Sequence, residues 1–171
     1  MRILFLDIDG VLNSNDYYVQ RQELIKAGTY NVEYPLSEFD PKCMKLLDEF
    51  CGEYDIKIVI SSTWRLLKTI EDLQKIFNHF GHNFEIIDKT PDLRHDAVVR
   101  GNEILWWMKQ NKELIQNYYD FNNYIILDDD SDMLLWQKDN FIKVDRFVGI
   151  TPQTIFKMKK ILHIFENNLN I

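Results

Sequence analysis

Short apolar runs alternate along the chain with longer segments in which apolar residues recur every three or four positions. The run at residues 3–6 is continuous and apolar, which is the pattern of a strand buried on both faces. Four further short, mainly apolar runs are also predicted to be strands, at residues 56–60, 84–87, 124–127 and 141–144. Helical spacing is found at residues 41–52, 70–80, 101–108, 133–137 and 152–165. This alternation predicts an α/β domain with a mainly parallel, five-stranded sheet flanked by helices.

Local signals mark where several of these helices begin and end. Asp40 and Thr151 each precede a proline, as an N-cap residue before the first helical position does. Gly52 is expected to end the helix predicted at residues 41–52, and Gly81 the helix predicted at residues 70–80.

One long segment, residues 13–38, has no apolar period and is rich in tyrosine and polar residues. It is too long for an ordinary connection between a strand and a helix. We interpret it as an irregular lid or small cap inserted after the first strand. With no sign of a second core, residues 1–171 are expected to form a single domain.

The composition is that of an ordinary globular protein, with 171 residues, 46% hydrophobic and 27% charged. The formal net charge of -7 argues against an extended footprint on duplex nucleic acid and against an anionic membrane surface. No stretch approaches the roughly 20 apolar residues of a membrane span. Cys43 and Cys51 are too far apart along one helix for an easy disulfide bond. A cytoplasmic protein with reduced thiols is the expectation.

Acidic residues follow two of the predicted strands. Asp7 and Asp9 come after the first strand, and residues 128–132 contain four aspartates after the fourth. If these strands are neighbours, the carboxylates converge beyond the carboxyl ends of the sheet, where open α/β sheets bind ligands. Converging carboxylates repel one another unless a cation lies between them, and hard oxygen ligands favour Mg²⁺. Aspartates that merely form turns after strands are the alternative.

These residues resemble the motifs of haloacid-dehalogenase-like (HAD) phosphatases. Residues 6–11, LDIDGV, resemble motif I; residues 58–61, IVIS, resemble motif II; and residues 125–129, IILDD, resemble motif IV. The motifs occur in the order of the superfamily and span most of the chain. The resemblance implies a Rossmann-like HAD fold.

A narrower resemblance links the chain to the HAD domains of Swiss Army knife RNA-repair proteins. It rests on short segments: SSTWR at residues 61–65, RGNEI at residues 100–104, the triple aspartate at residues 128–130, and GIT at residues 149–151.

The superfamily resemblance implies a role for each carboxylate. Asp7 would be the nucleophile that forms an aspartyl-phosphate, and Asp9 the general acid and base. Mg²⁺ would be bound by the Asp7 side chain, the Asp9 backbone carbonyl, and the carboxylates of Asp128 and Asp129. Asp132 would lie in the outer shell of that site.

The same resemblance implies residues that bind the phosphoryl group. Ser61 would hydrogen-bond a phosphoryl oxygen, and Gly10 and Ser62 would contribute to substrate binding. The tryptophan after motif II, Trp64, is a candidate for the mouth of the site. Four tyrosines of the insert could stack on a base or sugar, or could simply pack the lid onto the domain: Tyr17, Tyr18, Tyr30 and Tyr34.

The cation of motif III is usually a lysine, and here the sequence departs from the superfamily pattern. Arg100, at the start of a predicted helix, matches the narrower subgroup and could bind a phosphoryl group bidentately. Arg65 is a second candidate, with a structural salt bridge as the alternative. Lys89, after the third strand, is a third.

The sequence therefore predicts a Mg²⁺-dependent phosphomonoesterase. Its substrate would be the phosphorylated end of a nucleic acid, as the subgroup resemblance implies. A small phosphorylated metabolite or nucleotide is the alternative that the acidic charge favours. A non-catalytic HAD-like binding module is a third hypothesis, which the uncertain motif III leaves open.

Overall fold

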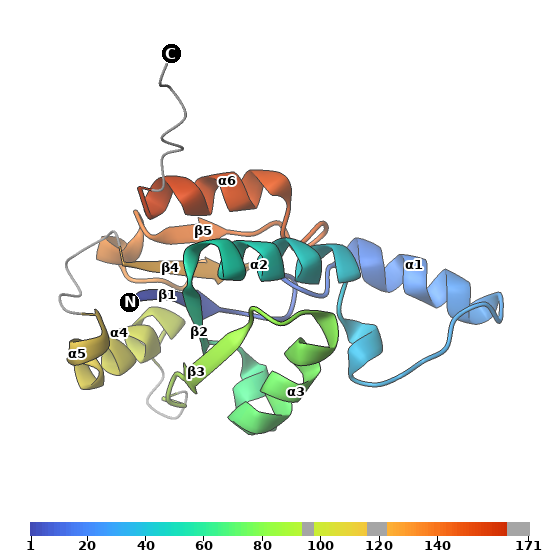
Figure 1. Cartoon of the computed structure of the whole chain (residues 1–171), viewed down its shortest axis with the longest axis horizontal. Helices are drawn as coiled ribbons and strands as arrows, with labels where there is room; N and C mark the ends of the chain where they lie inside the picture. Colours follow the sequence, from blue (N-terminus) through green and yellow to red (C-terminus); the bar gives the residue numbers. More distant parts are fainter. Residues whose placement is uncertain (94–97, 116–122, 164–171) are drawn as a thin grey trace, which may run out of the picture.

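A parallel sheet forms the centre of the molecule (Figure 1). The computed structural model describes residues 1–93, 98–115 and 123–163. Within them the strands are β1 (Arg2–Leu6), β2 (Ile56–Ile60), β3 (Glu85–Lys89), β4 (Tyr124–Asp128) and β5 (Phe141–Lys143). Their order is β3-β2-β1-β4-β5, and each neighbouring pair is parallel. The predicted α/β fold with a five-stranded sheet is confirmed, and the arrangement is the Rossmann-like one of HAD domains.

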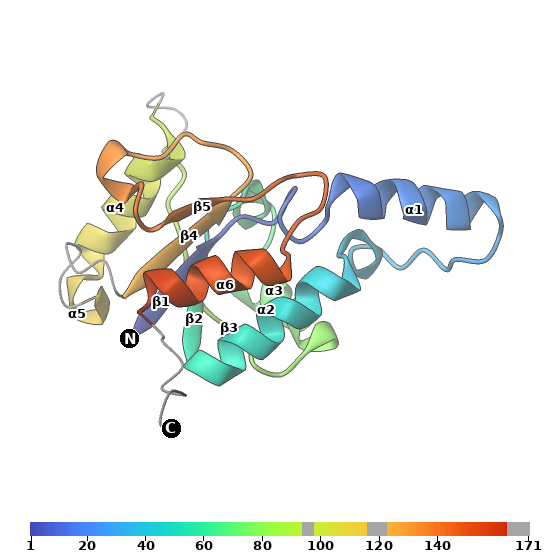
Figure 2. The ribbon, with the colours of Figure 1, turned by 90° about the horizontal axis from the view of Figure 1, so that it is seen from above.

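Helices cover both faces of this sheet (Figure 2). One face packs against α2 (Pro41–Tyr54), α3 (Ile70–Phe80) and α6 (Pro152–Ile161), and the other against α4 (Arg100–Gln110) and α5 (Lys112–Ile115).

Side chains of β1 explain why its apolar run is continuous. Leu4 and Leu6 belong to the core under α2 and α6, whereas Ile3 and Phe5 belong to the core under α4. Successive residues of a strand point to opposite faces, so a strand covered on both sides needs apolar residues at every position.

The inserted segment contains a helix that its sequence pattern does not reveal. Helix α1 (Asn15–Lys26) extends beyond the carboxyl ends of the strands (Figures 1 and 2). Ser14 caps it, and Arg21 is its one buried residue. The chain then returns through the short 3₁₀ helix η1 (Leu36–Glu38). The description of residues 13–38 as irregular is therefore wrong, because a helix exposed on almost all sides has no apolar stripe. Its action as a lid stays a prediction.

Several element boundaries differ from those predicted. Helix α2 passes through Gly52 and ends at Tyr54, where Asp55 adopts a left-handed conformation with φ of 50°. Strand β3 begins and ends later than predicted, so that Lys89 is its last residue. The helix expected at residues 133–137 is the 3₁₀ helix η4 (Leu135–Gln137), and α5 was not predicted. Helix α6 ends at Ile161, before the predicted boundary.

Both cysteines, Cys43 and Cys51, are buried free thiols on α2, as expected from their spacing. Among residues 1–93, 98–115 and 123–163, no helix combines the length and the apolar character that crossing a bilayer requires.

Candidate active site

Three neighbouring strands bring the predicted site residues to one edge of the sheet. Strand β1 lies between β2 and β4, with Leu6 in register with Ile60 and Leu127. The residues that follow in sequence are Asp7, Ser61 and Asp128, and they therefore meet at the carboxyl ends of adjacent strands. The condition set by the sequence, that the two acidic strands are neighbours, is fulfilled.

Three of the aspartates form a compact carboxylate group. One oxygen each from Asp7, Asp128 and Asp129 lies within 4.8 Å of the others. Gly10 leaves room for the Asp129 carboxylate, because a β-carbon at position 10 would lie 2.4 Å from Asp129 Oδ2. Its φ of +74° is also a conformation that favours glycine. The Gly10 amide donates a 2.8 Å hydrogen bond to Asn13 Oδ1. Contact of Gly10 with substrate stays a prediction.

Two of these carboxyl groups have raised pKa values. Burial raises the pKa of Asp7, and Arg100 opposes that shift. Burial, together with repulsion from Asp7, raises the pKa of Asp128 to about 7. A site that gathers negative charge in this way favours a cation or a proton.

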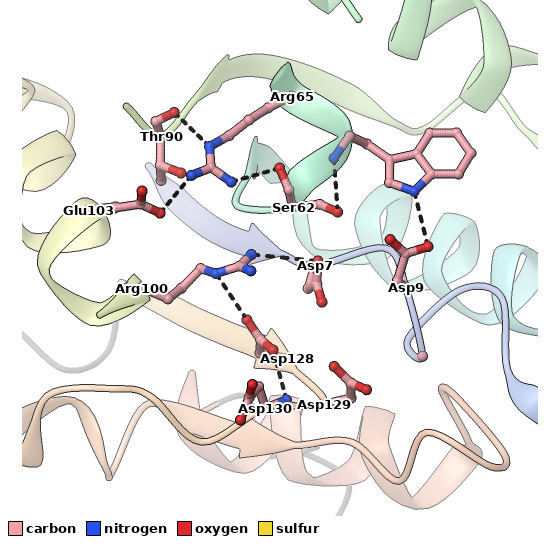
Figure 3. A network of polar contacts seen from close by, with 12 residues as sticks. Asp7, Asp9, Ser62, Arg65, Thr90, Arg100, Glu103, Asp128, Asp129 and Asp130 are labelled. Carbon is pink, nitrogen blue, oxygen red and sulfur yellow. Dashed lines mark hydrogen bonds and ion pairs between the residues drawn. The ribbon is translucent and has the colours of Figure 1, made fainter. Parts of the chain in front are cut away.

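Arg100 lies between the two buried carboxylates (Figure 3). Its Nη1 is 3.5 Å from Asp7 Oδ1, and its Nε is 3.7 Å from Asp128 Oδ2. Burial alone would lower the pKa of Arg100, but the surrounding carboxylates raise it. The backbone amide of Arg100 donates a 2.9 Å hydrogen bond to Asp132 Oδ2, which anchors the start of α4 beside the site.

The donor set fits Mg²⁺. Three carboxylate oxygens converge, and Mg²⁺ is a hard cation that prefers such ligands. Among the described residues, Asp128 Oδ2 is buried and receives no hydrogen bond, since Arg100 Nε at 3.7 Å is an ion-pair partner beyond hydrogen-bond distance. A bound cation would satisfy this oxygen directly. The Asp129 carboxylate also has a 2.8 Å ion pair with Arg146. Asp7, Asp128 and Asp129 could therefore hold the ion, while the Asp9 carboxylate lies outside their group.

The two serines after β2 face the same centre. The Ser61 hydroxyl is buried and has no hydrogen-bond partner among the described residues. A phosphoryl oxygen beside Asp7 would satisfy it. Burial raises the pKa of Asp7, and the nearby Ser62 side chain opposes that shift. The Ser62 hydroxyl accepts a 3.4 Å hydrogen bond from the Trp64 amide, and its contact with substrate stays a prediction.

Asp9 is held on the opposite side of Asp7 from Arg100 (Figure 3). Its Oδ1 accepts hydrogen bonds from Trp64 Nε1 at 3.0 Å and from Asn13 Nδ2 at 2.7 Å. An oxygen that accepts two N–H donors is a poor place for a proton, so Oδ2 is the atom suited to carry one. The role of Asp9 as a proton donor stays a prediction.

Arg65 lies in the core beneath the site. Its Nη2 is 2.6 Å from Glu103 Oε2, and both side chains are at least 95% buried. It also donates to the carbonyl oxygens of Ser62, Thr90 and Pro91. The structure contains the salt bridge that was the alternative interpretation, and this salt bridge joins η2 (Thr63–Leu66) to α4.

Replacement of Arg65 by Met is expected to lower the free energy of unfolding by about 3 kcal/mol, because it leaves the Glu103 carboxylate buried and unpaired. Urea unfolding measures the loss. The double variant Arg65→Met with Glu103→Leu should recover much of it. A variant of unchanged stability with lost substrate binding would contradict this structural role.

Lys89 is also occupied within the fold. Its Nζ donates to the backbone carbonyls of Arg65, at 2.8 Å, and Lys68, at 3.3 Å. Of the three candidates for the motif III cation, Arg100 is the one with ion pairs to Asp7 and Asp128.

Two residues of the site were not identified from the sequence. Asn13, placed only at the edge of the insert, orients Asp9. Arg146, paired with Asp129, follows β5 at the carboxyl edge of the sheet. The position of Arg146 after a strand adjacent to β4 is a signal that could have identified it.

A family model matches most of the chain. It describes the HAD domain in Swiss Army Knife RNA repair proteins, and it matches residues 3–155. The chain belongs to this family. Membership places this Swiss Army Knife HAD domain in the HAD superfamily of hydrolases and phosphatases. A search of curated proteins and a search of solved structures gave no significant match.

For this HAD domain, the match begins within β1, at residue 3, and includes the other four strands and the site residues described above. The suspected relationship to RNA-repair HAD domains is thereby confirmed.

Proposed function

We propose that this HAD domain is a Mg²⁺-dependent phosphomonoesterase that acts through an aspartyl-phosphate on Asp7, with phosphorylated nucleic-acid ends as substrates. The observation that carries the proposal is the position of Asp7. It lies between Arg100, the carboxylates of Asp128 and Asp129, and a buried Ser61 hydroxyl that has no hydrogen-bond partner within the described part of the chain. The family description, RNA repair, supports the substrate class.

In the first step an Asp7 carboxylate oxygen attacks phosphorus. A bond forms between Asp7 and phosphorus, and the bond from phosphorus to the leaving oxygen breaks. The leaving oxygen keeps the electron pair and takes a proton from Asp9 Oδ2. Arg100 and Ser61 bind phosphoryl oxygens during the transfer.

In the second step Asp9 works as a base. Its Oδ2 takes a proton from a water molecule whose oxygen attacks phosphorus, and the bond from phosphorus to Asp7 breaks. Inorganic phosphate is released, and both aspartates return to their starting states.

Mg²⁺ bound by Asp7, Asp128 and Asp129 would supply positive charge that reduces repulsion between the phosphoryl oxygens and the nucleophile. Arg100 supplies further positive charge beside Asp7, and it also balances the charge of Asp128.

The raised pKa values predict an unusual pH dependence of stability. Asp7 and Asp128 bind protons more tightly in the folded chain than in the unfolded chain, so stability falls as these groups ionise. Without metal, the melting temperature should fall between about pH 4 and about pH 7, and millimolar Mg²⁺ should raise it more at the higher pH. Differential scanning fluorimetry measures both effects.

Asp128→Asn serves as the control for that experiment. It should flatten the fall with pH and reduce the stabilisation by Mg²⁺. A wild-type melting temperature that rises steadily to about pH 8 without metal would contradict the assigned charges.

Trp64→Phe tests how Asp9 is positioned. It keeps an aromatic ring but removes the Nε1–H donor to Asp9 Oδ1. We expect kcat to fall roughly ten-fold for an alkyl phosphate, whose leaving oxygen needs a proton, and much less for p-nitrophenyl phosphate. Steady-state kinetics on both substrates measures the difference, and equal losses would contradict the positioning role.

Phosphate release with and without Mg²⁺ tests the proposed function. The substrates are p-nitrophenyl phosphate, 3′- and 5′-phosphorylated oligonucleotides, mononucleotides and sugar phosphates. We expect Mg²⁺-dependent release that is most efficient with oligonucleotides. Preference for a sugar phosphate or mononucleotide would favour the metabolite alternative. No release from any substrate would favour the binding module.

A further inference from the structure

A cleft of about 620 Å³ opens beside Asp9, on the side of the site away from the carboxylate group. It lies between η2 and the inserted segment, and its lining includes Asn13, Tyr34, Trp64, Leu67 and Lys68. Its volume is in the range of small-molecule binding sites.

Two aromatic rings and one cation give this cleft its chemistry. Lys68 Nζ lies 5.7 Å from the centre of the Tyr34 ring and 5.6 Å from the centre of the Trp64 ring, within the range of cation–π contacts. Tyr34 is 69% exposed, so its ring contributes little to the core. Trp64 is anchored by Phe39, whose ring centre is 5.2 Å away.

The proton path determines what can occupy the cleft. In the proposed reaction the leaving oxygen lies next to Asp9, because it takes its proton there. Whatever that oxygen is attached to must therefore extend away from phosphorus on the Asp9 side. Asp9 forms one wall of the cleft, so the cleft offers space for the leaving group. A second hollow beside Asp9 is smaller, at about 190 Å³.

We propose that this cleft is a nucleobase subsite, in which Tyr34 and Trp64 contact the base of the nucleotide that loses its phosphate. The inference rests on the proposed function, because the position of the leaving group follows from it. Every base has an apolar π-face, and stacking on protein aromatic rings is the common way to bind bases without sequence preference.

The charged side chains that line the cleft are compatible with a bound nucleotide. Glu38 also lines it, but its carboxylate is paired with Arg21 at 2.7 Å. Lys68 has a long flexible side chain, so its ammonium can turn from the two rings to the phosphate of an adjoining nucleotide. The cleft therefore combines stacking surfaces with one cation for the nucleic-acid backbone.

Paired substrates test this subsite. Each pair is a trinucleotide phosphorylated at its 3′ or 5′ end, with adenine or an abasic sugar at the phosphorylated position. We expect the base to raise kcat/KM of the wild type at least about ten-fold, the size of one stacking contact. Tyr34→Ala should lower this ratio several-fold, because only the Trp64 contact remains, whereas Tyr34→Phe should keep it. Phe156→Ala, which removes an exposed ring of α6, is the matched control.

Lys68→Ala tests whether the bound base belongs to an oligonucleotide or to a mononucleotide. It should lower kcat/KM for the trinucleotide and leave that for the mononucleotide nearly unchanged, because only the trinucleotide has a second phosphate. An equal loss for both would overturn the backbone role of Lys68.

The outcomes distinguish the subsite from the reaction. Equal turnover of base-containing and abasic substrates would overturn the subsite and leave the phosphatase intact. If no substrate is turned over, the proposed function fails, and calorimetric binding of the same pairs decides the subsite. Tighter binding of the base-containing member, reduced in Tyr34→Ala, would support it, and equal binding would overturn it.

Discussion

Asp7→Asn is expected to lower kcat by at least about a thousand-fold, because it replaces the attacking carboxylate with an amide that cannot form the acyl phosphate. Phosphate release from p-nitrophenyl phosphate in the presence of Mg²⁺ measures the loss. Asp130→Asn is the matched control, because this exposed aspartate lies in the same acidic run but outside the carboxylate group. It should retain most of the activity.

The stability of Asp7→Asn separates a chemical defect from misfolding. Burial raises the pKa of Asp7, so its charge is unfavourable in the folded chain without metal. The amide removes that charge, and the metal-free variant should melt at or above the wild-type temperature near pH 8. Activity close to wild type in a well-folded variant would contradict the role of Asp7.

Arg100→Gln is expected to lower kcat/KM by about a hundred-fold or more, since a single preorganised charge on a transferring group typically contributes this much. The loss includes the contact with the phosphoryl group and the balance of charge between Asp7 and Asp128. Steady-state kinetics at saturating Mg²⁺ measures it.

Two further variants complete the Arg100 experiment. Arg100→Lys keeps the charge but not the two-pronged geometry, and it should recover part of the lost activity. Lys109→Gln removes an exposed cation from the last turn of the same helix and should have little effect. If Arg100→Gln and Lys109→Gln behaved alike, Arg100 would not bind the phosphoryl group.

The centre of the fold was predictable because strands buried on both faces leave continuous apolar runs. In β1, β2 and β4 these runs end directly at Asp7, Ser61 and Asp128, so the convergence of the three residues followed from one assumption about strand order. The register of the parallel strands then places these three residues at the same edge of the sheet.

The inserted helix could not be predicted in the same way. Helix α1 buries only Arg21, so its sequence has no apolar face, and the capping residue Ser14 is a weak signal by itself. Its position depends on tertiary contacts, such as the ion pair from Arg21 to Glu38.

The roles of the two arginines also required the structure. Arg65 follows motif II and Arg100 begins a helix, and the sequence is compatible with either as the phosphate-binding cation. Arg65 is instead enclosed by Glu103 and three carbonyl groups, while Arg100 meets Asp7. Which carboxylate each arginine pairs with depends on how the elements pack together, and sequence spacing does not specify that packing.

The most direct test of the central claim is to trap the phosphorylated enzyme. The protein would be mixed with excess phosphorylated oligonucleotide and Mg²⁺, quenched in acid and reduced with borohydride, which converts an aspartyl-phosphate to homoserine. Peptide mass spectrometry should then find homoserine at position 7 in the wild type and not in Asp7→Asn. Phosphate release with no modification at position 7, or with modification of another residue, would contradict the account.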